Sequence, residues 1–295
     1  MLGLIGLGLV GSALFARFKQ AGFTVCGFDT NAAALAHLAS DGLQPCTSPC
    51  AVSKRARRIV LSLPDSASVD AVVEGENGLL ESAQPNDLII DTTTADPLAS
   101  SALAQRLRRR DIHFVDATIL GSSQQVRTGE VLIMAGGRQV DFTACSDLFA
   151  ACARKAYYMG ENGKGAEAKL IVNLVLGLNR LVLAEGLVLG ERTGVDGNAL
   201  LDVLRDGAAY SRVMDDKGEK MLSGEFSPQA RLAQHLKDVG LILEMGAREG
   251  APLPLSTLHA QVLQRGVEAG FGELDNAAVI EALRLFGESG EEEGE

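Results

Sequence analysis

The sequence contains no tryptophan, and aromatic side chains of all kinds make up only 4% of its 295 residues. Hydrophobic residues nevertheless account for 46% and charged residues for 22%. This balance is typical of a globular protein and excludes a disordered or collagen-like chain. The length is sufficient to bury a sizeable core and to form two domains.

Cysteine and histidine are scarce and scattered. The five cysteines form no Cys-x-x-Cys pair, and the four histidines are not spaced as metal ligands. We therefore predict no structural metal. An odd number of cysteines in a chain of this size favours reduced thiols in the cytoplasm over a disulfide framework.

Positive charge is also in short supply, because the formal net charge is −11. This balance argues against a surface built to bind nucleic acid. Basic clusters at 54–58 and 108–110 each precede an apolar run. We interpret both as solvated helix ends, where cations suit the negative end of the helix dipole.

The sequence shows no clear targeting or membrane segment. The first sixteen residues carry no charge, but they lack the basic start of a signal peptide and contain four glycines. Residues 170–190 are apolar almost all round, yet they include Asn173, Arg180 and Glu185. Such a helix in a soluble chain is typically buried in a core or an interface. We therefore expect no membrane partner and predict a homodimer or homotetramer.

The first 160 residues alternate short apolar runs with helical patterns. This alternation predicts a parallel sheet with helices on both faces. The predicted strands are 2–5, 24–28, 58–63, 87–91, 113–116 and 131–135, and the clearest helices are 12–21, 32–40 and 98–110.

Beyond residue 160 the pattern is helical throughout. One long helix is predicted over 163–192, followed by helical stretches at 197–206, 208–222, 228–249, 254–269 and 275–286. The expected fold is therefore α/β, with a Rossmann dinucleotide-binding domain at 1–160 and an all-helical substrate and dimerisation domain at 161–286. The acidic tail, 287–295, is predicted to be disordered, and a catalytic cleft is expected between the domains.

A glycine-rich segment follows the first predicted strand. Its residues are Gly6, Leu7, Gly8, Leu9, Val10 and Gly11, a GxGxxG pattern between a strand and a helix. In that setting the first glycine permits a tight turn, the second lets a pyrophosphate approach, and the third allows close helix–strand packing. We predict that this segment binds a dinucleotide.

The second predicted strand ends in Asp29, which can accept hydrogen bonds from ribose hydroxyls and repel a 2′-phosphate. No arginine follows to neutralise such a phosphate, so NAD is favoured over NADP. Leu63, Pro64 and Thr94 lie in two later loops at strand ends. These loops either line the nicotinamide side or serve as strand-to-helix caps.

Several motifs in order resemble the β-hydroxyacid dehydrogenase family, over residues 2 to about 285. The matching segments are 116–122 with Gly129, the set Gly163, Gly165, Lys169 and Asn173, the pair Lys237-Asp238, 252–255 and 275–277. The family includes 3-hydroxyisobutyrate dehydrogenase and tartronate semialdehyde reductase.

The resemblance implies a role for each matching residue. Lys169 takes the alcohol proton, and Asn173, four residues later on the same helix face, orients the substrate. Lys237 is implied to lie near both cofactor and substrate. Backbone N–H groups of Gly121 and Ser122 are implied to bind the substrate carboxylate. The retained lysine argues against the related imine reductases.

Two positions depart from the family pattern. Leu120 replaces a substrate-binding serine, and Thr118 replaces a proline. The lost hydroxyl is either absent or moved to Ser122 or Ser123. An apolar pocket favours a 3-hydroxyisobutyrate-like substrate over the more polar tartronate semialdehyde. A catalytically silent, NAD-binding regulatory protein is the alternative of another class.

Overall fold

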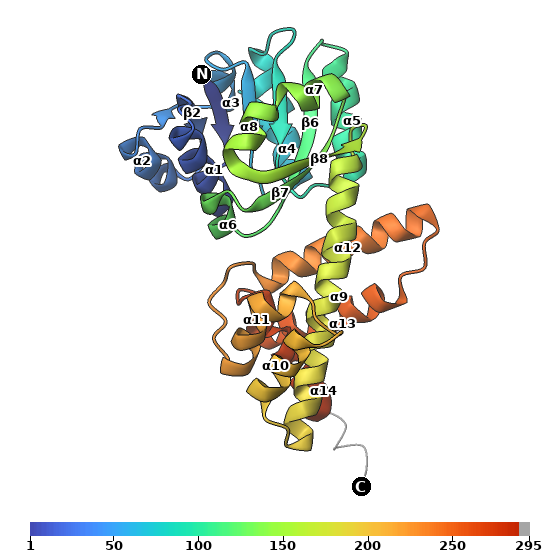
Figure 1. The fold of residues 1–295 in the computed structure, drawn as a ribbon. Coiled ribbons are helices and arrows are strands. Elements are labelled where there is room, and N and C mark those ends of the chain that lie inside the picture. Colours follow the sequence, from blue (N-terminus) through green and yellow to red (C-terminus); the bar gives the residue numbers. More distant parts are fainter. Residues whose placement is uncertain (289–295) are drawn as a thin grey trace. The chain divides into compact units, whose positions relative to one another are not determined.

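The computed structural model describes residues 1–288 and divides the chain into two compact units, Met1–Lys169 and Leu170–Glu295 (Figure 1). The disordered tail predicted at 287–295 lies, from residue 289 on, outside the described residues. Each unit has its own hydrophobic core.

The first unit is an eight-stranded sheet in the order β3-β2-β1-β4-β5-β6-β7-β8. The strands are β1 (Leu2–Ile5), β2 (Val25–Phe28), β3 (Gln44–Pro45), β4 (Arg58–Leu61), β5 (Leu88–Asp91), β6 (His113–Leu120), β7 (Val131–Gly136) and β8 (Ala153–Gly160). The strands from β1 to β6 pair in parallel. The predicted Rossmann architecture is confirmed.

The far edge of the sheet differs from the predicted parallel arrangement. β7 runs antiparallel to β6. The segment 121–130 between them is too short for a parallel crossover, which needs a dozen or more residues. β8, which the sequence did not predict, pairs with β7 at the edge. Its side chains are mostly exposed, so it carries no apolar run to reveal it.

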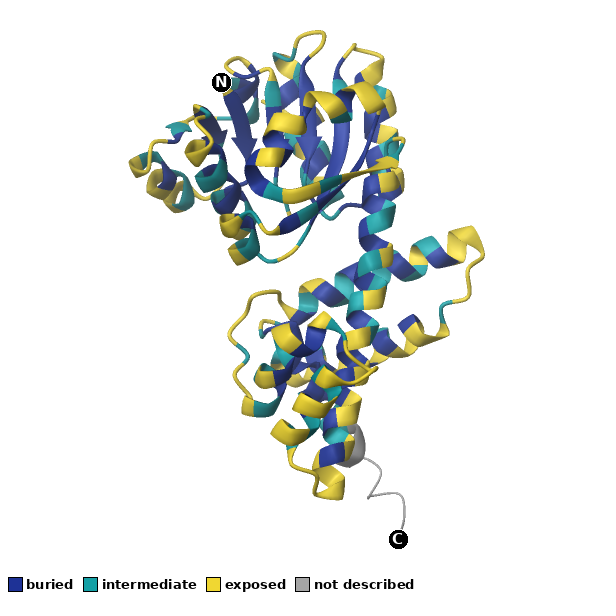
Figure 2. Cartoon of the chain, in the orientation of Figure 1, coloured by how far each residue is buried: buried dark blue, intermediate teal, exposed yellow. Residues whose placement is uncertain are grey.

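Helices cover both faces of this sheet. They are α1 (Leu9–Gln20), α2 (Ala32–Ser40), α3 (Pro49–Ser53), α4 (Ser66–Glu74), the 3₁₀ turn η1 (Leu79–Glu81), α5 (Pro97–Arg108), α6 (Ser123–Thr128), α7 (Gln139–Ala144) and α8 (Ser146–Cys152). The basic clusters lie where α3 and α5 end. The central strands β1, β4, β5 and β6 are largely buried, while the outer faces of the helices are exposed (Figure 2).

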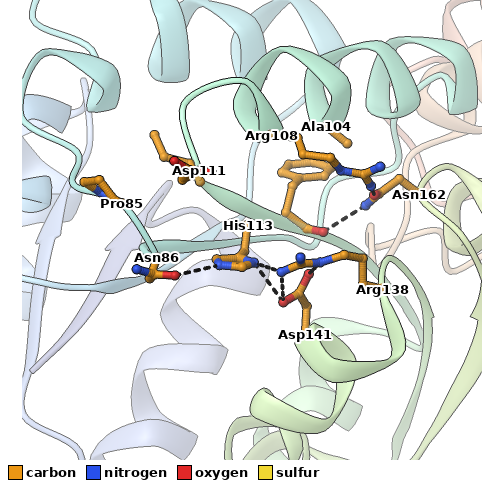
Figure 3. A pocket seen from close by; sticks show the side chains of 11 residues that line it. Pro85, Asn86, Ala104, Arg108, Asp111, His113, Arg138, Asp141 and Asn162 are labelled. Atoms are coloured by element: carbon orange, nitrogen blue, oxygen red, sulfur yellow. Dashed lines mark hydrogen bonds and ion pairs between the residues drawn. The ribbon is translucent and has the colours of Figure 1, made fainter.

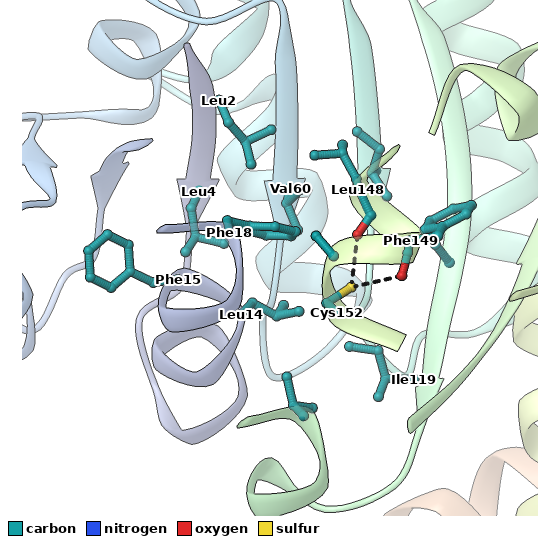
Figure 4. Close-up of a cluster of buried hydrophobic side chains, with 14 of the residues drawn as sticks. Leu2, Leu4, Leu14, Phe15, Phe18, Val60, Ile119, Leu148, Phe149 and Cys152 are labelled. Carbon is teal, nitrogen blue, oxygen red and sulfur yellow. Dashed lines mark hydrogen bonds between the residues drawn. The ribbon is translucent and has the colours of Figure 1, made fainter. Parts of the chain in front are cut away.

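Alternate residues of the central strands point into two separate cores, as a sheet covered on both faces requires. In β1, Leu2 and Leu4 pack in the core that also contains Phe18 of α1 and Phe149 of α8 (Figure 4). Ile5 belongs to the other core, which is closed by side chains of α4 and α5.

The second unit is helical. It contains α9 (Lys164–Thr193) from Leu170 on, α10 (Gly197–Asp206), α11 (Arg212–Ser223), α12 (Leu232–Glu249), α13 (Pro254–Gly266), the π-helical turn η2 (Val267–Phe271), the 3₁₀ turn η3 (Asn276–Ala278) and α14 (Val279–Glu288). Within residues 1–288, only α9 is long and apolar enough to cross a membrane. Of the residues in an apolar stretch of 18 in this helix, 39% are buried within the protein. Core helices of soluble proteins can have the same length and composition.

Candidate active site

The loops that follow four parallel strands open at one edge of the sheet. Ile5 stands in register with Phe28 of β2 and with Leu61 of β4, and Leu61 with Asp91 of β5. The strand order reverses between β1 and β4. Ligands of doubly wound sheets bind at the carboxyl edge beside such a reversal.

The glycine loop at this edge has one glycine open to a ligand and two that the fold requires. Gly6 has a positive φ of 89°, and a Cβ there would lie 2.1 Å from the carbonyl oxygen of Ser62. A Cβ on Gly11 would lie 1.9 Å from the carbonyl oxygen of Gly6. A Cβ on Gly8 would meet nothing within 4 Å. Within the described part of the chain no side chain caps the amino end of α1, so its N–H groups suit a dinucleotide pyrophosphate.

Leu9 and Val10 form the first turn of α1 beside this loop, and the Leu9 side chain is exposed. Asp29, directly after β2, ties the loop to the neighbouring strand. Its Oδ2 accepts the N–H of Leu7 at 2.6 Å, and its Oδ1 accepts the N–H of Asn31 at 2.7 Å. The Asp29 carboxylate therefore stands where the cofactor ribose is expected, with each oxygen retaining capacity for a further donor.

The two later loops both start helices. Asp65 caps α4 by accepting the N–H of Ser68 at 2.9 Å. A hydrogen bond of 3.1 Å from the N–H of Leu63 to Oγ1 of Thr93 joins the loops. Pro64 is exposed and Thr94 half-buried at the same edge.

Asp91, the last residue of β5, has a fully buried carboxyl group. Burial raises its pKa to about 7, against the opposing hydrogen bonds from Thr93. Its neighbour in the sheet is Asp116 of β6, another buried acid whose charge raises the pKa of Asp91 further. The Asp91 carboxyl group therefore keeps its proton to a higher pH than an exposed aspartate does.

Asp116 anchors the start of the long helix α9. Its Oδ1 accepts the N–H of Gly163 at 2.9 Å, and its Oδ2 accepts the N–H of Ala166 at 3.1 Å. Burial raises the pKa of Asp116, and these hydrogen bonds oppose the rise. A carboxylate at the amino end of a helix also suits the positive end of the helix dipole.

Thr118, two residues further along β6, strengthens the same joint. Its buried hydroxyl lies 3.0 Å from the carbonyl oxygen of Gly165 and 3.2 Å from that of Met134. A Cβ on Gly165 would lie 2.4 Å from the carbonyl oxygen of Asp116, so only glycine lets the helix approach this closely. Lys169 follows one turn later and is 9% exposed. The strand thus fixes the helical turn that carries Lys169.

The same strand ends in the predicted substrate segment. Gly121 has a φ of 144°, and a Cβ there would lie 2.6 Å from Cγ1 of Val131. Ser122 and Gln125 form a capping box at the start of α6. The N–H of Ser122 donates to Oε1 of Gln125 at 2.8 Å, so it is not available to the substrate carboxylate as the resemblance implied. Ser123 and Leu120 flank the turn, and both are half-buried.

The remaining candidates lie in the helical unit. Nδ2 of Asn173, on α9, donates to Oδ2 of Asp238, on α12, at 3.1 Å. Both side chains are buried, while Lys237 beside Asp238 is half-buried. Sequence reasoning named Asp238 only as part of a motif and missed it as the residue that orients the Asn173 amide.

A surface pocket lies at the opposite, amino edge of β5 and β6 (Figure 3). Asp141 there accepts two hydrogen bonds from Arg138, of 2.7 and 2.9 Å, and lies 3.0 Å from Nδ1 of His113. No predicted site residue lines this pocket. The pocket is therefore separate from the glycine loop.

Comparison with protein families agrees with this geometry. Residues 1–160 match the NAD-binding domain of 6-phosphogluconate dehydrogenase. Residues 163–283 match the family described as NAD-binding of NADP-dependent 3-hydroxyisobutyrate dehydrogenase. The fold and these matches together define an NAD(P)-binding oxidoreductase.

Individual relatives show to which family of oxidoreductases the chain belongs. The chain is 31% identical to L-threonate dehydrogenase of Cupriavidus necator, over 95% of this chain and 94% of the relative. It is 30% identical to 2-(hydroxymethyl)glutarate dehydrogenase of Eubacterium barkeri, over 95% and 93%. A structure of Mycobacterium tuberculosis 3-hydroxyisobutyrate dehydrogenase with L-serine superposes with a TM-score of 0.88, at 25% identity and coverage of 96% and 98%. The chain belongs to the β-hydroxyacid dehydrogenase family, which confirms the predicted resemblance.

Proposed function

We propose that this protein is an NAD-dependent dehydrogenase that oxidises the CH–OH group of a small 3-hydroxy acid, with an activity like that of 3-hydroxyisobutyrate dehydrogenase. The observation that carries the proposal is the buried Lys169, one turn beyond a helix start that Asp116 and Thr118 hold against β6. A base carried on a helical turn that is held this firmly meets the geometric demand of proton transfer.

In this proposal each group of the chain has a distinct task. The amine of Lys169 accepts the alcohol proton, and Asn173, oriented by Asp238, positions the substrate. A bound nicotinamide supplies the hydride acceptor. The N–H groups of Gly121 and Ser123 and the hydroxyl of Ser122 hold the substrate carboxylate. The role of Lys237, near cofactor and substrate, rests on the family resemblance.

The preference for NAD rests on Asp29. Its carboxylate stands beside the glycine loop, where it would accept ribose hydroxyls and repel a 2′-phosphate. Gly6, Gly8, Leu9, Val10 and Gly11 would hold the pyrophosphate, with Leu63, Pro64 and Thr94 on the nicotinamide side. Replacing Asp29 by Asn removes the charge at nearly the same size, and its effect on the ratio of NAD to NADP turnover tests the preference. An unchanged ratio contradicts it.

The substrate assignment rests on the apolar character of the last two residues of β6. Ile119 and Leu120 offer no hydrogen bond, which favours a less polar acid than tartronate semialdehyde. An apolar site gives no hydrogen bond to an added hydroxyl but rejects it only weakly, so the preference should be modest. We therefore expect 3-hydroxyisobutyrate to give a higher kcat/KM than glycerate or L-threonate.

The decisive experiment follows reduced cofactor by absorbance with a panel of 3-hydroxyisobutyrate, 3-hydroxypropionate, glycerate, L-threonate and serine. Lys169→Ala is the test variant, and Lys164→Ala is its matched control, because Lys164 lies on the same helix with an exposed side chain paired to Glu167. We expect turnover that the test variant loses and the control keeps. Cofactor binding without turnover of any acid would instead support the silent regulatory alternative.

We also infer that the helical unit pairs with a second copy of the chain. Ile171, Val175, Val182 and Leu189 form an exposed apolar stripe along α9, each more than half exposed. Their spacing keeps them on one helix face. Sedimentation of a Val182→Glu variant tests this, with Val203→Glu on α10 as the control. Monomers are expected only for the first variant, and dissociation of both or neither contradicts the stripe as the interface.

A further inference from the structure

A second group of polar side chains is buried in the helical unit, about three turns along α9 from Lys169. At its centre is Arg180, whose side chain is fully enclosed at 4% exposure. Its Nε and Nη1 are buried and have no hydrogen-bond partner among the side chains and backbone that the structure describes. A buried guanidinium with two unpaired donor atoms is strongly unfavourable, so this arrangement requires an explanation.

The acid that interacts with Arg180, Asp275, does not balance this charge. Asp275 is fully buried and already accepts Nζ of Lys217 at 2.7 Å. It also accepts the N–H groups of Gln229 at 2.9 Å and Ala277 at 3.1 Å. Burial lowers the pKa of Arg180 to about 10, although Asp275 opposes this, so the guanidinium stays protonated at neutral pH. With Lys217 paired to Asp275, the group retains one uncompensated positive charge.

His259 brings a further unused polar atom to this group. Its Nε2 is buried without a hydrogen-bond partner among the described residues. Burial and the charge of Arg180 lower the pKa of His259 to about 4, so the imidazole is neutral at pH 7. A neutral imidazole with its proton on Nε2 is a hydrogen-bond donor.

The helix backbone shows that these groups lie together. A Cβ on Gly177, one turn before Arg180, would lie 2.7 Å from Cε1 of His259. The imidazole therefore packs directly against α9, and glycine is required there. The rings of His259 and His235 pack with their centroids 5.1 Å apart.

A bound water molecule would accept hydrogen bonds from these N–H groups but would leave the positive charge of Arg180 uncompensated. A small monovalent anion satisfies both, because it accepts N–H groups and neutralises the guanidinium. We propose that the helical unit contains a buried site for a small monovalent anion, a halide or a compact carboxylate, held by Nε and Nη1 of Arg180 with Nε2 of His259 as a further donor. This site is distinct from the residues proposed for the dehydrogenase reaction, so it stands independently of them.

The first test is thermal unfolding of the intact protein with bromide, formate or the bulky isethionate at constant ionic strength. Ligands of the native state raise the unfolding temperature. We expect bromide or formate to raise that of the wild type by about 2–4 °C relative to isethionate, which is the effect of ~1 kcal/mol of stabilisation in a protein of this size. A response to bromide alone assigns a halide, and a response to formate alone assigns a carboxylate.

Arg180→Met should remove this response, and Arg192→Met should keep it, because Arg192 is an exposed arginine on the same helix. An equal rise in both variants, or no rise in the wild type, overturns the proposal. Diffraction from wild-type crystals soaked in bromide gives an answer even if Arg180→Met does not fold. An anomalous peak is expected beside Nε and Nη1 of Arg180, and density for water alone in that position overturns the site.

Discussion

The hydroxyl of Thr118 in β6 lies 3.0 Å from the carbonyl oxygen of Gly165 in the first turn of α9. This hydrogen bond joins the sheet to the turn that precedes Lys169. It also gives a purpose to a residue whose type departs from the family pattern, since a proline at this position has no hydroxyl.

Replacing Thr118 by Val keeps the shape of the side chain and removes its hydroxyl. We expect a loss of stability of about 1–2 kcal/mol, because a buried hydrogen bond is deleted. Loosening the turn before Lys169 should lower kcat by about tenfold with little change in cofactor affinity. Thr118→Ser is the control and should retain most activity. A fall in stability with unchanged kcat would show that the bond serves the fold alone.

The three glycines of the cofactor loop should respond differently to an added methyl group. Gly8→Ala meets open space, so we expect unfolding within about 0.5 kcal/mol of the wild type. The same change should weaken cofactor binding by about tenfold or more, because the Cβ occupies the path of the pyrophosphate. Gly11→Ala should instead destabilise the domain by about 3 kcal/mol through its clash with Gly6. Calorimetry and cofactor titration separate the two effects. Equal cofactor affinity in Gly8→Ala would argue against the proposed binding mode.

The buried carboxyl group of Asp91 should make stability depend on pH. In the folded protein its pKa is raised from 3.8 to about 7, so between these values the folded state binds a proton that the unfolded state releases. Stability from this group is therefore present below pH 4 and is lost as the pH rises to about 7. The Asp91→Asn variant lacks this dependence. Its stability relative to the wild type should increase over that range by at most about 4 kcal/mol. Urea unfolding at several pH values measures the difference, and a constant difference would contradict the raised pKa.

Lys217 should matter more to folding than a typical lysine. Its Nζ lies 2.7 Å from the fully buried Asp275. Lys217→Met leaves that carboxylate without its cation, and we expect a loss of about 3–5 kcal/mol. Adding Asp275→Asn to this variant should recover part of the loss, because the uncompensated charge is removed while one acceptor oxygen remains. A double variant no more stable than Lys217→Met would show that backbone hydrogen bonds to Asp275 dominate.

The local sequence pattern was sufficient to predict most strands and helices of the first unit. β1 occupies the predicted residues because its apolar run stops at Gly6, where the backbone turns with a positive φ. β8 was missed because an edge strand needs no buried face, and Arg154 and Lys155 give it no apolar pattern. The antiparallel direction of β7 was also missed. The alternation of strands and helices predicted a parallel strand, but the connection from β6 is too short for a parallel crossover.

In the candidate site, too, local sequence patterns predicted some residues, while others are brought there only by contacts between distant parts of the chain. Helical spacing correctly placed Lys169 and Asn173 on α9. The acids that hold their surroundings, Asp116 and Asp238, lie on other elements, 53 residues before Lys169 and 65 residues after Asn173. Arg180 was visible as a polar interruption in an apolar helix, but its burial depends on contacts that no local pattern encodes.

The anchoring of α9 on β6 also determines where this chain can be divided. A fragment that stops at residue 160 contains all eight strands of the sheet, yet it discards the N–H groups of Gly163 and Ala166 that Asp116 accepts. In that fragment the buried Asp116 carboxylate would lack these two hydrogen-bond donors. A nucleotide-binding domain expressed alone therefore has to include the first turn of α9. A chimaera with a relative is best joined within α9, after residue 169, so that the helix continues across the junction.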